Sequence, residues 1–456
     1  MEPLLFKTRI IGVVFFAAIF IAGFLLTTNR RRFLLAYGTI TAGFQIELLL
    51  TYFGAVITLS YLAFLALLIY SFIEPKRDIK HPKPRVLWPW LGMLFFAALA
   101  VTKAIDPNMA RAPFVMFAFD VIMFFAVLRT VKTSGDVRFY VGCLMAAIIV
   151  QGMIGLLQYK FPFFKIGVID HYQSYMWWRA KGTFFHANHY GMFLLLTLPL
   201  ALRYLINAMA ERNAKWMMYG FATFGIGLVA LLASYNRGSW GGLVFGLLIM
   251  LAVDFTKRGV KIRRILSNLL ALAFLGVGLL SIKFAPKIYD RVFQDDAEGQ
   301  LEGRGEQIDE AIPLILSNPV IGVGYNNDRF YASVIFVHNV YMLIAAEIGI
   351  PGLLCFLWFM LEILREIWAV SRSSVLYCAN YARGALAGML GFCLAGWVGP
   401  DFWINYGVQS YFWLVLALLF AVSRLKRVVL FKQKQMALAQ KNKRSPQPHE
   451  TNLSQS

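Results

Sequence analysis

The sequence contains few charged residues. Only 15% of its 456 residues are Asp, Glu, Lys or Arg, whereas 59% are hydrophobic and the mean hydropathy is +0.62. A soluble protein of ordinary composition carries roughly 25% charged residues, so this composition excludes an ordinary soluble domain. Apolar runs of about 18 residues recur along the chain, and each is long enough to cross the ~30 Å hydrocarbon core as a helix. The sequence therefore predicts an all-α polytopic membrane protein.

Cysteine is scarce, and the common catalytic signatures are absent. The four cysteines have no CxxC spacing and indicate neither a disulfide framework nor a metal site. The sequence contains no Walker loop, HExxH, GxSxG or DxD pair. Any chemistry must therefore come from isolated polar residues at the ends of the membrane helices, and no cofactor or metal is expected.

The net charge of +20 is concentrated in short loops. The basic residues cluster at 29–32, 74–85, 129–138, 254–264 and in the tail from Arg424. Basic loops that alternate with apolar runs are what the positive-inside rule predicts for the cytoplasmic face. The charge is thus explained by topology and attraction to membrane lipids, and nucleic acid is not expected as a partner.

Thirteen apolar segments are candidate membrane helices. They cover residues 10–27, 33–52, 55–73, 87–103, 112–130, 139–158, 190–206, 217–234, 238–254, 265–283, 340–361, 384–404 and 408–424. If residues 33–73 do not form two full spans, the number becomes 12 and the N-terminus moves to the cytoplasm. We expect a transmembrane domain over residues 1–425 and a basic, disordered cytoplasmic tail over 426–456.

Two loops fall on the outer face and are too long to be simple turns. The first covers about 159–189, and its many aromatic residues suit the membrane–water interface. The second covers about 284–338 and is rich in acidic residues. Residues 306–316 keep helical apolar spacing and predict an amphipathic helix lying on the membrane, which Pro313 would kink or shorten.

Basic residues are rare on the outer face. Arg237 lies in "SYNRGSWGG" between two apolar runs, where it either binds an anion or reaches lipid phosphates. Arg304 is flanked by glycines that allow an anion to approach closely, but local acids offer it surface pairs instead. Arg179 and Lys181 either bind phosphate or anchor their loop in lipid headgroups.

Histidines precede two of the predicted spans. His338 is followed by Asn339, a favoured N-cap residue, and the positive end of the next helix favours the neutral imidazole that a general base requires. The alternative is a histidine hydrogen-bonded into the loop. His186 and His189 flank Asn188 at the start of another span, where lining the same cavity and capping the helix are both consistent with the sequence. Their spacing is a weak metal signal without a third ligand.

Two carboxylates fall inside predicted spans. Glu47 lies in the second span and Glu347 in the eleventh. An intramembrane carboxylate is either functional or a packed group that is protonated or hydrogen-bonded. Gly349 and Pro351 indicate a bend close to Glu347 and a close contact between helices.

Four segments at membrane boundaries occur in a characteristic order. They read "KGTFFHANHYGMFLLLTLPLALR", "ASYNRGSWGGLVFGLL", "GRGEQIDEAIPLILSNPVIGVGYNN" and "VHNVYMLIAAEIGIPGLL". This succession resembles the bacterial O-antigen ligase superfamily over about residues 180–360. One departure is "EQIDEAIP", where many members have an aromatic residue soon after the motif's arginine.

The resemblance implies a membrane glycosyltransferase of type C architecture with its active site facing the periplasm. A ligase of this kind moves a glycan from undecaprenyl diphosphate to a sugar hydroxyl of lipid A–core in the bacterial inner membrane. The reaction would be metal-independent and inverting. Arg237 and Arg304 would hold the diphosphate, with Arg179 and Lys181 as further candidates, and His338 would act at the acceptor hydroxyl.

Other functions stay open on the sequence alone. The nearest is an O-antigen or exopolysaccharide polymerase of the same superfamily. A protein oligosaccharyltransferase is a weaker alternative, since such enzymes tend to have larger periplasmic parts. A transporter or flippase for polyprenyl-linked glycans would instead show inverted repeats and polar groups at mid-membrane. A scaffold without catalysis would tolerate alanine at the candidate residues.

Overall fold

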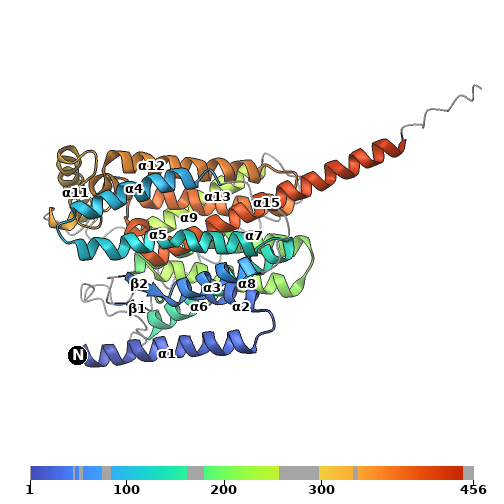
Figure 1. Ribbon diagram of the computed structural model, residues 1–456, viewed down its shortest axis with the longest axis horizontal. Helices are drawn as coiled ribbons and strands as arrows, with labels where there is room; N and C mark the ends of the chain where they lie inside the picture. Colours follow the sequence, from blue (N-terminus) through green and yellow to red (C-terminus); the bar gives the residue numbers. More distant parts are fainter. Residues whose placement is uncertain are drawn as a thin grey trace, which may run out of the picture.

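The fold is a bundle of long helices lying side by side (Figure 1). The computed structural model describes residues 2–44, 47–50, 55–73, 84–161, 179–255, 297–331 and 337–444. Within these residues, six helices are long and apolar enough to cross a membrane. These are α5 (Pro107–Thr130), α6 (Ser134–Lys160), α7 (Ala187–Ala210), α8 (Ala214–Ala233), α9 (Arg237–Phe255) and α12 (Val340–Ser371). The all-α polytopic prediction is confirmed.

The remaining elements complete the bundle and its ends. They are α1 (Glu2–Leu26), α2 (Arg30–Thr41), β1 (Glu47–Leu50), β2 (Ala55–Thr58), α3 (Leu59–Ile73), α4 (Leu87–Lys103), α11 (Ala297–Ser317), the 3-10 turn η2 (Asp328–Phe330), α13 (Leu376–Gly396), α14 (Asp401–Ile404) and α15 (Tyr406–Arg444). The predicted span 265–283 lies outside the described residues.

The predicted helical span over 33–52 is wrong. Helix α2 ends at Thr41, and β1 and β2 then form an antiparallel hairpin in which Glu47 is paired with Thr58. Residues 50–58 are rich in β-branched and aromatic side chains, which favour strands over helices. Residues 33–73 therefore do not form two helical spans, and Glu47 is not a mid-helix carboxylate.

Two boundaries near the C-terminus also differ from the prediction. The span expected over 384–404 is α13, which ends at Gly396 and is followed by a turn and the short helix α14. Helix α15 continues far beyond the expected end at 424 and projects from the bundle (Figure 1). Its extension contains Lys, Gln and Ala, which propagate a helix well. The expected disorder from residue 426 is therefore wrong as far as Arg444.

Helices α9 and α13 pack against each other through glycine. Gly238, Gly242 and Gly246 recur every fourth residue and thus share one face of α9. A Cβ on Gly242 would lie 2.6 Å from the carbonyl oxygen of Gly391, and one on Gly246 would lie 2.1 Å from that of Ala387. Small residues allow such close approach of membrane helices. This packing places the start of α9 beside the turn that follows α13.

A buried group of three charged side chains joins α7, α9 and α13. Asp254 lies 2.5 Å from Arg203 through one carboxylate oxygen and 2.9 Å from Arg383 through the other. All three residues are at most 2% exposed. A charge buried this deeply is tolerated only when it is paired. The group lies at the end of α9 opposite to Arg237, where it fixes the far end of the contact between α9 and α13.

Helix α12 is broken at Gly349, whose φ of 79° is open to glycine but strained for other residues. The break leaves the carbonyl oxygens of Ala346 and Glu347 without their helical partners. They accept hydrogen bonds from the backbone of Val323 (2.8 Å) and Gly324 (3.2 Å). The bend predicted at this position is confirmed, and the segment before η2 is joined to α12 through it.

Glu347 itself is packed inside the protein. Its side chain is 1% exposed and accepts a 2.6 Å hydrogen bond from the indole of Trp403 in α14. Of the two interpretations of Glu347, a packed and hydrogen-bonded carboxylate is therefore the one that matches its surroundings. The contact also fixes α14 against α12.

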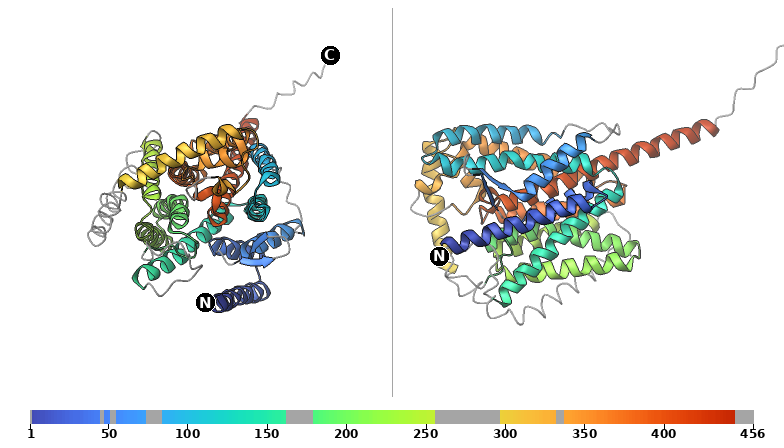
Figure 2. Two further views of the ribbon diagram at one scale, coloured as in Figure 1. Left: turned by 90° about the vertical axis from the view of Figure 1, so that its left-hand side faces the viewer. Right: turned by 60° about the horizontal axis from the view of Figure 1, so that its bottom comes forward.

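Helix α11 lies crosswise over one end of the bundle (Figures 1 and 2). Gln307 and Ala311 are buried on its inner face, whereas Ile308, Ile312 and Leu316 are between 38% and 70% exposed. The predicted amphipathic helix over 306–316 is thus present. Pro313 does not shorten it, because α11 continues to Ser317.

Candidate functional site

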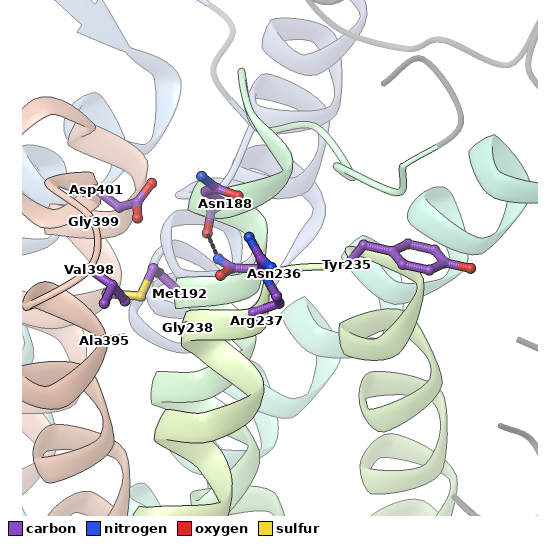
Figure 3. A pocket seen from close by; sticks show the side chains of 10 residues that line it. All are labelled: Asn188, Met192, Tyr235, Asn236, Arg237, Gly238, Ala395, Val398, Gly399 and Asp401. Atoms are coloured by element: carbon purple, nitrogen blue, oxygen red, sulfur yellow. Dashed lines mark hydrogen bonds between the residues drawn. The ribbon is translucent and has the colours of Figure 1, made fainter. Parts of the chain in front are cut away.

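A cavity of about 250 Å³ opens where the first turns of α7 and α9 meet the turn after α13 (Figure 3). Its wall is formed by Asn188, Met192, Tyr235, Asn236, Arg237, Gly238, Ala395, Val398, Gly399 and Asp401. The predicted arginine Arg237 and the predicted Asn188 are both in this wall. Two helix N-termini reach the cavity, and the positive ends of helix dipoles favour anions.

Arg237 is held at the cavity by the chain that precedes it. Asn236 caps the first turn of α9, because its Oδ1 accepts the backbone N–H of Ser239 (3.2 Å). Its Nδ2 donates to the carbonyl oxygen of Asn188 (3.0 Å), which ties α9 to α7 (Figure 3). The backbone of Tyr235 has a φ of 50°, and its ring points away from the cavity. Arg237 is thus the first residue of a rigidly capped helix.

Asp401 forms the opposite wall, and sequence reasoning missed it. The residue is buried, which raises the pKa of its carboxyl group to about 7, although Arg179 opposes the shift. Its Oδ1 lies 3.5 Å from His189 Nε2. The only signal in the sequence is an acid in "GPDFW" at the end of an apolar run. A carboxyl group with a strongly raised pKa in the wall of a cavity that also contains Arg237 is a feature of functional sites.

His189 is oriented by Asn405. The Oδ1 of Asn405 accepts the backbone N–H of Val408 (3.0 Å), so its Nδ2 is the atom 2.8 Å from His189 Nδ1. An amide nitrogen only donates, so Nδ1 accepts and the proton of the neutral ring is on Nε2, directed at Asp401. His189 therefore directs its Nε2–H toward Asp401, and it is not part of the cavity wall.

Arg179 supports the cavity from behind. This buried side chain donates from Nε to the carbonyl oxygen of Ser234 (2.7 Å) and from Nη2 to Asn188 Oδ1 (2.7 Å). It thereby joins the end of α8 to the start of α7. Lys181 follows on the same segment, where its backbone N–H donates to Gln158 of α6 (3.3 Å). The structure places both predicted cations near the cavity without making either part of its wall.

His186 caps helix α7. Its Nδ1 accepts the backbone N–H of Asn188 (3.0 Å), and its ring centroid is 5.6 Å from that of His189. Burial lowers the pKa of His186, and the nearby charges of His189, Arg179, Lys181 and His338 lower it further. Predicted residues from two segments of the sequence, 179–189 and 338, thus lie within electrostatic reach of His186.

His338 lies at the junction of α11 and α12. Asn339 caps α12 as predicted, because its Oδ1 accepts the backbone N–H groups of Tyr341 (3.0 Å) and Met342 (3.1 Å). Gln307 on the inner face of α11 contacts both the backbone nitrogen and the ring of His338. Sequence reasoning missed Gln307. The available signal was that this polar residue lies on the apolar face of the predicted helix.

Arg304 is positioned only through its helix. It lies in α11 one turn before Gln307, and its side chain lies outside the described part of the structure. Among the described residues, no group of three or more His, Cys, Asp or Glu side chains is arranged to hold a metal ion.

The comparison with protein families gives one match. Residues 222–357 match a family model described as O-antigen ligase. This stretch, the O-antigen ligase region, is similar to the O-antigen ligase family. The O-antigen ligase region begins within α8, ends within α12 and contains Arg237, Arg304 and His338. The resemblance to the O-antigen ligase superfamily is thereby confirmed over the three motifs that lie in this region, and a function of the O-antigen ligase or polymerase type is supported.

No curated protein matches the chain. The O-antigen ligase region supplies one wall of the cavity and His338, whereas Asn188 and Asp401 lie before and after it. The complete cavity therefore requires segments on both sides of the O-antigen ligase region.

Proposed function

We propose that this chain is an O-antigen ligase that transfers a glycan from undecaprenyl diphosphate to a sugar hydroxyl of lipid A–core. The reaction takes place at the periplasmic face of the inner membrane. The observation that carries this proposal is the position of Arg237 at the N-terminus of α9, in a cavity beside the cluster formed by His186, Arg179 and His338.

The diphosphate is the chemical group that the cavity suits best. An arginine offers planar, bidentate hydrogen bonds to phosphate and stays charged at every working pH. The N-terminus of α9 adds oriented backbone N–H groups and a positive dipole. Arg304 joins Arg237 in this role. Both groups stabilise the negative charge that develops on the leaving diphosphate, and such interactions contribute about 10²–10³ in rate.

His338 acts at the acceptor. The imidazole ring takes the proton of the acceptor hydroxyl. As it does so, the hydroxyl oxygen bonds to the anomeric carbon of the donor, and the bond between that carbon and the diphosphate oxygen breaks. This single displacement inverts the anomeric carbon and needs no ATP, because the donor already contains a good leaving group. General base catalysis of this kind contributes about 10²–10⁴ in rate.

The test is transfer by the purified protein. Given a labelled undecaprenyl-diphosphate glycan and lipid A–core, the parent protein should move the label to lipid A–core. Arg237→Ala and His338→Ala should abolish most of this transfer. Full transfer by His338→Ala would contradict the role of the histidine as the base.

The same assay separates the alternatives. A ladder of products on the polyprenyl lipid, without label on lipid A–core, would identify a polymerase. Movement of label across sealed vesicles without a new glycosidic bond would identify a transporter. The location of the charged candidates at one end of the bundle favours the transferase over the transporter.

A further inference from the structure

Gln307 makes two contacts to His338 with one oxygen atom. Its Oε1 accepts the backbone N–H of His338 at 3.0 Å and lies 2.9 Å from the ring Nδ1. Gln307 is 8% exposed and lies on the buried face of α11 with Ala311. The contact joins residues 31 positions apart, so it is tertiary and depends on how α11 lies over the bundle.

The backbone contact settles the orientation of the amide. A backbone N–H is always a donor, so the atom that faces it must be the carbonyl oxygen of Gln307. The same oxygen faces Nδ1, and two acceptors in contact would repel each other. Nδ1 therefore carries a proton, and in the neutral ring the lone pair is on Nε2.

The neighbouring histidines have the opposite arrangement. The Nδ1 of His186 accepts a backbone N–H, and the Nδ1 of His189 accepts the amide of Asn405. In their neutral forms both rings therefore carry the proton on Nε2. Of these three histidines, His338 is the one whose Nε2 can accept a proton.

We infer that Gln307 is a positioning residue that holds His338 as the Nδ1–H tautomer and directs its basic Nε2 to the acceptor hydroxyl. This inference rests on the proposed function. It adds a reason why α11 lies across the bundle. The helix that contains Arg304 also contains Gln307 one turn later, and Gln307 sets the tautomer of the base His338.

Histidine NMR tests the tautomer without any activity. With ¹⁵N-histidine labelling and assignment by comparison with His338→Ala, the parent protein should show Nδ1 of His338 protonated and Nε2 unprotonated above the pKa of the ring. Gln307→Leu, of similar volume but without an acceptor, should shift both signals toward a mixture of tautomers. An unprotonated Nδ1 in the parent protein would overturn the inference and leave the transferase function intact.

Kinetics test whether Gln307 acts through His338. We expect Gln307→Leu to lower kcat about 10- to 100-fold, as losses of supporting hydrogen bonds to functional residues do. Gln307→Glu keeps the acceptor, so it should retain most of the rate. Its carboxylate stabilises the imidazolium, so the acidic limb of the pH–rate profile should move upward by about one pH unit. Among the described residues, His186 is a titratable group that interacts with His338, and it is unchanged in every variant.

Two controls make the result specific. Ile308→Ala, on the exposed face of the same helix, should leave rate and pH profile unchanged. Adding Gln307→Leu to His338→Ala should cause no further loss, since residues that act as one unit are not additive. A full additional loss in the double variant, or an unshifted profile in Gln307→Glu, would contradict the positioning role. Parental activity in His338→Ala would instead show that His338 is not the base, which contradicts the proposed function itself.

Discussion

Gly242 of α9 and Gly391 of α13 meet backbone to backbone. A Cβ added to Gly391 would lie 2.3 Å from the carbonyl oxygen of Gly242, closer than any side chain tolerates. This contact holds two helices that contribute opposite walls of the cavity, one beginning at Arg237 and the other followed by Asp401. The geometry of the site therefore depends on residues that have no polar side chain.

Gly246→Ala should destabilise the protein. Its new methyl group would lie 2.1 Å from the carbonyl oxygen of Ala387, so α9 and α13 would have to separate. Overpacking of this kind costs about 1–3 kcal/mol. The thermal midpoint of unfolding in detergent measures the effect. Gly241→Ala is the matched control, because a Cβ there meets nothing within 4 Å. Equal midpoints for the two variants would refute the close-packing account.

Asp254→Asn should be more damaging than the loss of a surface ion pair. The change removes the carboxylate charge that pairs with Arg203 and Arg383, and breaking a buried pair costs about 3–5 kcal/mol. Glu362→Gln is the control, because Arg365 in that pair is exposed and such pairs contribute about 0–1 kcal/mol. Folded yield and unfolding midpoint report both effects. A smaller loss in Asp254→Asn than in Glu362→Gln would contradict a structural role for the buried group.

Asp401 should make stability depend on pH. Its pKa is about 7 in the folded protein and about 4 in the unfolded chain, so the folded state binds the proton more tightly. This contribution is fully present below pH 4 and is lost as the pH rises to about 7, a change on the order of a few kcal/mol. Asp401→Asn should flatten the unfolding midpoint over this range. Asp106→Asn, a helix cap outside the cavity, should keep the parental dependence.

Arg237→Ala should lower the transfer rate about 10²–10³-fold at saturating donor. Arg237→Lys should lose less, because it keeps the charge and gives up the bidentate geometry. Arg372→Ala serves as the control, since this exposed arginine follows α12 at its far end. Rates of label transfer to lipid A–core distinguish the variants. If Arg237→Lys is no more active than Arg237→Ala, the planar geometry of the guanidinium is required in addition to its charge. If both Arg237 variants match the parent, Arg237 does not hold the donor.

Much of the fold could be predicted from composition and apolar run length. Long runs such as α6 and α12 span the membrane because nothing else can bury so many apolar side chains. The prediction was wrong where local preferences oppose hydropathy, as in the hairpin around Glu47. The turn after Gly396 escaped prediction because tryptophan, valine and phenylalanine extend the apolar run across it.

The site was predictable only in part. Arg237 and His338 were recognised because a cation or an imidazole at a membrane boundary needs a reason. Asp401 and Gln307 were not, since their significance lies in contacts with Arg179, His189 and His338 that no local pattern contains. For His186 the sequence left helix capping and cavity lining open, and only the geometry of the turn before α7 shows that it caps the helix.

The break at Gly349 has a mechanical consequence. The two carbonyl groups that it releases are bonded to the segment before η2, so the first turns of α12 form one rigid piece with that segment. His338 sits at the tip of this piece. Any displacement of the outer end of α12 must therefore carry the imidazole along as a unit, while the long remainder of the helix stays anchored in the bilayer.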